Sequence, residues 1–106
     1  MKDFPELIQR LPPFEGPFDA RRLAAEGCEV LFASYPAGTI IEPHTHPTEN
    51  VGVIVSGELI VATASGERRV GPGGWYHLTA GERHWARFEV ATSEIEFWFE
   101  ANRTSA

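Results

Sequence analysis

Short apolar segments separated by turn-forming residues fill the sequence from residue 29 to residue 100. The segments include VLFASY, LIVATA, ERRV, WYHL, HWARFEV and EIEFWFE, and the turns between them fall at residues 36–38, 65–66, 71–74 and 79–81. Strands of this length at this spacing are typical of a sandwich or barrel. We therefore expect an all-β domain of seven or eight strands, in two sheets whose apolar faces cover each other.

The first 19 residues depart from this pattern and are predicted to form an extended N-terminal arm. The arm contains Pro5, Pro12, Pro13 and Pro17. Proline lacks an N–H and disfavours a helical conformation of the residue before it, so extended chain is favoured over helix. The next segment, Asp19 followed by ARRLAAE and Gly27, fits a short capped helix and fits a strand ending in a turn equally well.

The segment from Gly38 to Gly57, GTIIEPHTHPTENVGVIVSG, is predicted to be extended and carries two histidines one residue apart. Residues i and i+2 of a strand face the same side, so His44 and His46 should point to one place. The same alternation places Asn50 on the histidine side and Glu49 on the other. The other side also carries an apolar stripe, Val51, Val53 and Val55, which must be covered.

A second polar cluster, AGERHWARF, begins with a turn at Gly81 and continues into a predicted strand. His84 opens this strand, with Ala86 and Phe88 on the same face. Taken alone, a histidine at this place is better explained as a core or rim residue than as a ligand. Its interpretation depends on the first cluster.

Together, the two clusters resemble the motifs of the cupin superfamily. The first motif is a glycine, five residues, His-x-His, three or four residues, a glutamate, six residues and a glycine. Gly38 to Gly57 fits this spacing, with Asn50 in the glutamate position. The second motif is a glycine, five residues, a proline, one residue, a glycine, two residues and a histidine. Gly73 to His84 fits it, with Thr79 in place of proline, whereas the competing register from Gly66 to His77 leaves too few residues between the motifs for two strands.

The resemblance covers about residues 28–99 and implies the family's fold, a double-stranded β-helix or jelly-roll barrel. It favours the strand over the helix for residues 20–35. The resulting division is an extended, Pro-rich arm at residues 1–19, a single barrel at residues 20–101 and a polar tail at residues 102–106.

In the family, the residues at the motif positions converge on one metal inside the barrel. The resemblance therefore implies that His44, His46, Asn50 and His84 hold a divalent transition metal, which would be Fe, Mn, Ni, Zn or Cu. An amide oxygen is a neutral and weaker donor than a carboxylate, so metal affinity should be lower than with glutamate. Three nitrogen ligands leave open positions for water, O₂ or a chelating substrate.

Glu49 is the candidate catalytic residue. A local bulge would turn its carboxylate toward the metal, where it would act as a ligand or a general base. Strand alternation predicts instead that Glu49 faces outward into solvent. Further along, either Trp75 with His77 or Tyr76 with Leu78 should line the cavity, since the members of each pair share a face.

Length and charge narrow the possible partners. The chain has 106 residues, enough for one domain with a single core, and its formal charge of −6 argues against nucleic acid or an anionic membrane. No apolar run approaches the ~20 residues that span a bilayer.

Cys28 is the only cysteine and the N-terminus lacks a secretory signal, so a cytoplasmic location is expected. The apolar stripe and the apolar side chains of the arm predict a homodimer.

Three functional hypotheses remain, because this fold hosts many unrelated activities. The first is a metal-dependent, dioxygenase-like enzyme that acts on a small organic molecule. The second is a non-catalytic cupin that binds or senses a small molecule. The third is a metal-free isomerase or epimerase in which a cavity histidine moves protons; it needs a carboxylate partner for that histidine, and the sequence offers only Glu49.

Overall fold

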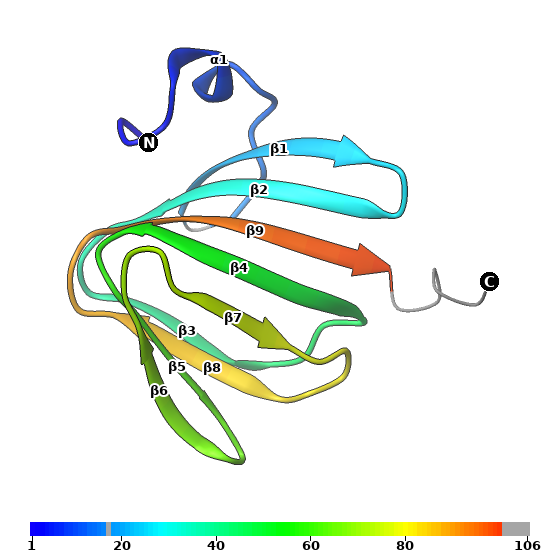
Figure 1. The fold of residues 1–106 in the computed structure, drawn as a ribbon, viewed down its shortest axis with the longest axis vertical. Helices are drawn as coiled ribbons and strands as arrows, with labels where there is room; N and C mark the ends of the chain where they lie inside the picture. The colour runs from blue at the N-terminus through cyan, green and yellow to red at the C-terminus, as the bar shows by residue number, and fades with distance from the viewer. Residues whose placement is uncertain (17, 101–106) are drawn as a thin grey trace.

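The computed structural model describes residues 1–16 and 18–100, and in this part of the chain two antiparallel sheets enclose a core (Figure 1). One sheet has five strands in the order β1-β2-β9-β4-β7, and the other has four in the order β3-β8-β5-β6. The predicted all-β jelly-roll barrel is confirmed. The elements are α1 (Glu6–Gln9), β1 (Asp19–Ala25), β2 (Cys28–Tyr35), β3 (Thr39–His44), β4 (Thr48–Ser56), β5 (Leu59–Thr63), β6 (Gly66–Val70), β7 (Trp75–Leu78), β8 (His84–Phe88) and β9 (Thr92–Glu100).

The alternation of β4 shows which side of the five-stranded sheet faces the core. Asn50, Gly52 and Ile54 are buried inside the barrel, whereas the residues between them are partly exposed on the outer face. Tyr35 from β2 of the same sheet, and Leu59 and Phe88 from the facing sheet, complete the core around Ile54. The outer face carries the predicted apolar stripe Val51, Val53 and Val55.

The single extended strand predicted from Gly38 to Gly57 is wrong, because the chain changes sheets within it. β3 belongs to the four-stranded sheet and β4 to the five-stranded sheet, and residues 45–47 connect them. Pro47 has no N–H to donate to a ladder, which favours a break at this point. His44 therefore ends one sheet, while His46 lies in the connection.

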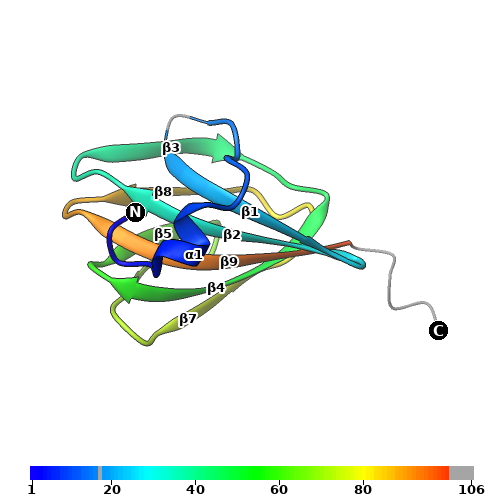
Figure 2. The ribbon, with the colours of Figure 1, turned by 90° about the horizontal axis from the view of Figure 1, so that it is seen from above.

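The prediction of a fully extended N-terminal arm is wrong, because the arm contains the one-turn helix α1. Pro5 precedes the helix at its N-cap, a position next to the first turn where the missing N–H of proline costs nothing. Phe4 is buried, and its ring meets Phe32 of β2 edge-on with centroids 5.6 Å apart. The arm thus covers part of the outer face of the five-stranded sheet (Figure 2).

Residues 19–25 form a strand, as the resemblance predicted, and not a helix. Their partner is β2, and the hairpin closes where Ala25 faces Cys28 across a turn in which Gly27 has φ 69°. A positive φ is readily adopted only by glycine, which fixes the turn at this position. Among the described residues, no helix has the length and hydropathy needed to cross a membrane. The predicted tail, residues 102–106, lies outside the described residues.

Candidate metal centre and ligand cavity

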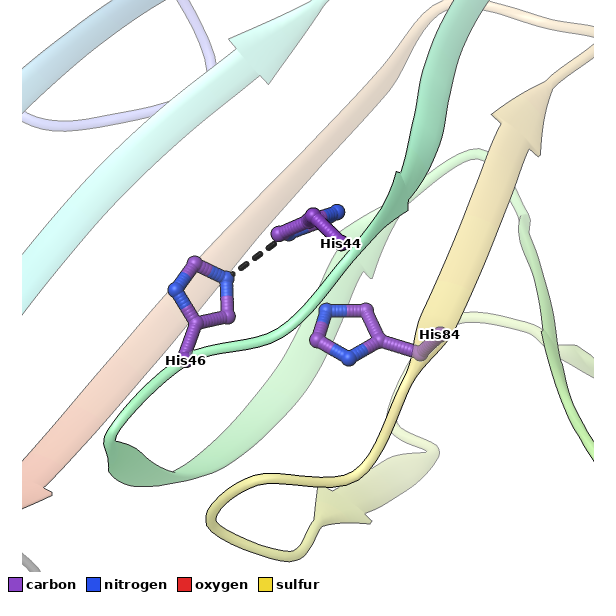
Figure 3. A group of neighbouring side chains, drawn as sticks. All are labelled: His44, His46 and His84. Carbon is purple, nitrogen blue, oxygen red and sulfur yellow. Dashed lines mark hydrogen bonds between the residues drawn. The ribbon is translucent and has the colours of Figure 1, made fainter.

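Three histidines from separate parts of the chain meet inside the barrel (Figure 3). His44 is the last residue of β3, and His84 is the first residue of β8 and its partner in the ladder. His46 comes from the connection to β4. One possible ligand nitrogen from each ring lies within 4.8 Å of the other two. The structure therefore brings together the three imidazoles that the two sequence clusters contain.

Backbone carbonyl groups fix the orientation of two of these rings. Nδ1 of His44 lies 2.7 Å from the carbonyl oxygen of Glu42, and Nδ1 of His84 lies 3.1 Å from that of Glu82. A carbonyl oxygen only accepts, so each Nδ1 carries the proton and each Nε2 presents a lone pair. Histidine ligands of metals are commonly held in this way by their second nitrogen.

The connection that carries His46 is itself tied to the loop that leads into β8. The N–H of Gly81 donates to the carbonyl oxygen of His46 at 2.8 Å. The His46 ring also lies against Trp98 of β9, with centroids 4.7 Å apart. Two contacts from different sides thus hold this histidine in the cavity, although it is not part of a strand.

The donor set fits a divalent transition metal. Nε2 of His44 and Nε2 of His46 are hydrogen-bonded to each other at 2.8 Å (Figure 3), a separation at which both nitrogens can bind one metal with bonds of about 2.0–2.1 Å. Burial, followed by the nearby His44 and His84, lowers the pKa of His46 to about 4. Burial also lowers the pKa of His84. Both rings are neutral at physiological pH, which is the form that binds metals.

Asn50 lies where the sequence predicted it, in the same cavity as the histidines. Its side chain is buried, and its Oδ1 accepts a hydrogen bond from the Thr48 hydroxyl at 2.6 Å. An amide oxygen has two lone pairs, so this bond leaves one free for a metal or a ligand.

Glu49 is the one candidate site residue that the structure does not bring to the cavity. Its carboxylate accepts hydrogen bonds from Nε2 of His77 at 2.7 Å and from the N–H of Ala80 at 2.5 Å. The ladder of β4 with β9 shifts only between Ile54 and Ser56, so no bulge turns Glu49 inward. The Ala80 N–H and then the His77 side chain lower the pKa of Glu49, which keeps it ionised on the outer face.

The histidines and Asn50 line a small cavity of about 70 Å³ between the sheets. Of the two pairs left open by the sequence, Tyr76 with Leu78 lines the cavity, and Trp75 with His77 is exposed outside. The polar lining residues are His44, His46, Asn50, Tyr76, His84, Glu94 and Glu96, and the apolar ones are Ile41, Leu59, Val61, Leu78, Ala86 and Phe88.

This geometry agrees with a match in sequence, since a model of the Cupin domain family covers residues 31–97. The chain belongs to the cupin family. No protein of curated function matches the sequence.

Solved structures share the whole barrel of this cupin. An RmlC-like cupin from Shewanella frigidimarina has a TM-score of 0.78 and 16% identity, over 97% of this chain and 93% of that one. Ectoine synthase from P. lautus has a TM-score of 0.77 and 18% identity, over 90% and 74% of the two chains. The DMSP lyase DddQ from Ruegeria pomeroyi has a TM-score of 0.72 and 22% identity, over 89% and 55%. At these identities the likeness shows the fold alone.

This cupin also has a pair of buried carboxyl groups in the cavity, which the sequence reasoning missed. Glu94 and Glu96 of β9 are 1% and 8% exposed. Glu96 accepts hydrogen bonds from the Tyr35 hydroxyl at 2.5 Å and from the Trp98 indole N–H at 2.9 Å. Glu94 accepts one from the Tyr76 hydroxyl. Neither carboxyl group has an ion pair with a cation in the described part of the chain.

Burial dominates the acid–base properties of this pair. It raises the pKa of Glu94 well above the ordinary glutamate range, and the negative charge of Glu96 raises it further. Burial also raises the pKa of Glu96, while hydrogen bonds from Tyr35 and Trp98 oppose that rise. The pKa values of both tyrosines are raised by burial and by the two acids, so the phenols remain donors.

The signal for this pair was present in the alternation of the last strand. Glu94 and Glu96 occupy one face, and the other face carries Ile95, Phe97 and Phe99. The usual pattern of apolar residues inside would place the acids in solvent. In β9 the two acids face the core and these apolar residues face outward, an arrangement that can be seen only from the position of the strand in the barrel.

Proposed function

We propose that this cupin is a metal-dependent enzyme that binds an oxygen-bearing end of a small organic molecule in the barrel cavity. The observation that carries the proposal is the convergence of three imidazole nitrogens, with the rings of His44 and His84 oriented by carbonyl groups. A divalent transition metal bound there would supply Lewis-acid chemistry to a carbonyl or carboxylate oxygen.

The side chains of the cavity limit what can bind. The cavity of about 70 Å³ is small, so only the reacting end of a larger ligand fits beside the histidines. Leu59, Val61 and Phe88 exclude water from that end and strengthen polar interactions with it. The Asn50 amide is placed to complete the donor set or to bind the ligand.

Oxygenation is one reaction class that such a site supports, but the cavity favours a second. The isomerase hypothesis required a carboxylate in the cavity, and Glu94 and Glu96 supply two. A carboxyl pair in the cavity can act as general acid and general base, which favours proton transfer. The similar structures include a lyase and a synthase, so the fold gives no preference for oxygenation.

A homodimer is the assembly that we propose. The outer face of the five-stranded sheet holds the half-buried Phe97 between Trp75 and Phe99, with ring centroids 6.2 and 6.5 Å away. Trp75 is 56% exposed, and Val55 of the apolar stripe is also exposed. A second copy paired across this face would cover it. A cytoplasmic location stays a prediction from the sequence.

Metal binding tests the proposal directly. Protein purified without a histidine tag should bind about one equivalent of Co²⁺, read from its visible absorption, and His84→Ala should lower the affinity by about 100-fold or more. His77→Ala is the matched control, because His77 is exposed and bonded to Glu49 outside the cavity. Wild-type protein that binds no transition metal, or His77→Ala that loses it equally, would contradict the proposal.

A further inference from the structure

We infer that Glu94 and Glu96 work as a single carboxylic acid–carboxylate pair, which gives a proton to and takes a proton from an enolisable carbonyl compound in the cavity. The inference deepens the proposed function and rests on it in one respect, since the carbonyl end of the same molecule must be held at the three histidines.

The hydrogen bonds around Glu94 and Glu96 indicate that the two carboxyl groups hold one proton between them. Tyr35 and Trp98 both donate to Glu96, and the indole N–H cannot accept, so these contacts suit a carboxylate. Glu94 and Glu96 are both buried on the inner face of β9 and line the same cavity, so two negative charges there would repel each other. Because two carboxylates this close in a buried site cannot both be ionised, Glu94 is the acid and Glu96 the base in the resting state.

The pair shares the cavity with the histidines and is connected to them through Trp98. The indole N–H of Trp98 donates to Glu96, while its ring lies 4.7 Å, centroid to centroid, from His46. On the other side, the Tyr76 hydroxyl reaches Glu94. Glu94 and Glu96 therefore form part of the wall of the ligand cavity, and their oxygens accept hydrogen bonds from the surrounding side chains.

Proton transfer by this pair needs no oxidant or reductant. The proton on the carbon beside the carbonyl group passes to Glu96, and the electron pair of the broken C–H bond forms the C=C bond of an enol. The Glu94 proton passes to the carbonyl oxygen, whose π electron pair becomes the new O–H bond. The pair holds one proton before and after the step. Return of a proton to the same carbon regenerates the substrate or gives its epimer. When that carbon carries a hydroxyl group the intermediate is an enediol, and the isomer forms when the former carbonyl carbon takes up a proton while this second hydroxyl loses its proton and becomes the new carbonyl group.

The cavity size defines the substrate class. The cavity of about 70 Å³ is small and suits a short enolisable fragment such as an α-hydroxycarbonyl group of two or three carbons. Glycolaldehyde, dihydroxyacetone and lactaldehyde are suitable probes. Exchange of their α-hydrogens with solvent deuterium reports the first proton transfer, whatever the full substrate is.

Infrared spectroscopy of the ligand-free protein at pH 7 tests the one-proton state. Wild-type protein should show the C=O band of a protonated carboxyl group, and Glu94→Gln should lose it. Glu100→Gln, an exposed position of the same strand, is the matched control and should retain the band. A wild-type spectrum without the band would overturn the inference, and this readout does not depend on metal binding.

Deuterium exchange tests the proton transfer itself, with protein loaded with the metal it binds best. Wild-type protein should accelerate exchange of at least one of the three probes by about 100-fold over free metal in buffer, and Glu94→Gln should remove most of that acceleration. The glutamine amide still donates to Glu96 and accepts from Tyr76, so its fold and Co²⁺ affinity should match those of the wild type.

The outcomes separate the two proposals. Exchange of none of the probes by metal-loaded protein, or an equal rate in Glu94→Gln, would overturn the role of the pair and leave the metal site standing. A wild-type protein that shows the infrared band but binds no Co²⁺ would overturn the metal-dependent function and the transfer step that relies on it.

Discussion

The two faces of the five-stranded sheet carry glutamates in opposite settings. On the outer face, Glu49 lies near solvent and accepts hydrogen bonds from His77 and from the Ala80 N–H, so it is ionised. On the inner face, Glu94 and Glu96 are buried with no ion pair to a cation among the described residues, and they keep one proton between them. The residue type is the same, and its surroundings decide whether it is a surface charge or an exchangeable acid.

A substitution that disturbs the packing around Glu94 and Glu96 should have the largest effect on the free energy of unfolding. Gly52 of β4 faces Tyr76, and a Cβ at position 52 would overlap the tyrosine ring. Gly52→Val should therefore displace Tyr76 from Glu94 and lower the free energy of unfolding by about 3 kcal/mol. Urea denaturation measures the change. Gly71→Ala is the control, because a Cβ there meets open space, and it should cost far less.

Removing one hydrogen bond from the inner pair should have a smaller effect. Tyr76→Phe keeps the ring and deletes the hydroxyl that donates to Glu94, which leaves a buried carboxyl oxygen without that donor. The expected loss is about 2 kcal/mol in the free energy of unfolding. A loss below the error of the denaturation curve would mean that the cavity hydrates this oxygen.

The pH dependence of stability should distinguish the two faces by its sign. The pKa of Glu94 is raised on folding, so its contribution is full below the ordinary glutamate pKa of about 4.5 and is lost as pH rises above it. Glutamine cannot ionise. The unfolding free energy of the wild type should fall relative to that of Glu94→Gln as pH rises from about 4.5, measured by urea denaturation at several pH values.

Substitution of Glu49 on the outer face should have the smallest effect on stability, and this effect should depend on pH in the opposite direction. The pKa of Glu49 is lowered on folding, so its contribution is present above the ordinary glutamate pKa and is lost as pH falls below it. Glu49→Gln should change Tm little at pH 7, because the His77 partner is exposed. Loss of deuterium exchange in this variant would show that the two faces are not independent.

The sequence predicted the strands from their local spacing, and the resemblance of two spaced motifs to the cupin superfamily implied the barrel and the meeting of the three histidines. Turns at glycine and proline delimit the strands, and the motif spacing connects His44 and His46 with the distant His84. Alternation also placed Asn50 inside and Glu49 outside. The strand bounds and this alternation need only the order of residues within one segment.

Features that depend on which sheet or face a segment occupies were not predictable in this way. The change of sheet after His44 leaves no mark in the alternation, so residues 38–57 were expected to be one strand. In β9, Glu94 and Glu96 alternate with apolar residues, and composition alone favours the wrong side for them. The short helix α1 forms in a Pro-rich arm because Pro5 stands at its start and not inside it.

The backbone bond between Gly81 and the carbonyl of His46 ties together the two loops that bring His46 and His84 into the barrel. One loop moves away from the other only when that bond breaks. The rate at which the Gly81 amide takes up deuterium therefore gives the frequency with which the two loops separate in solution.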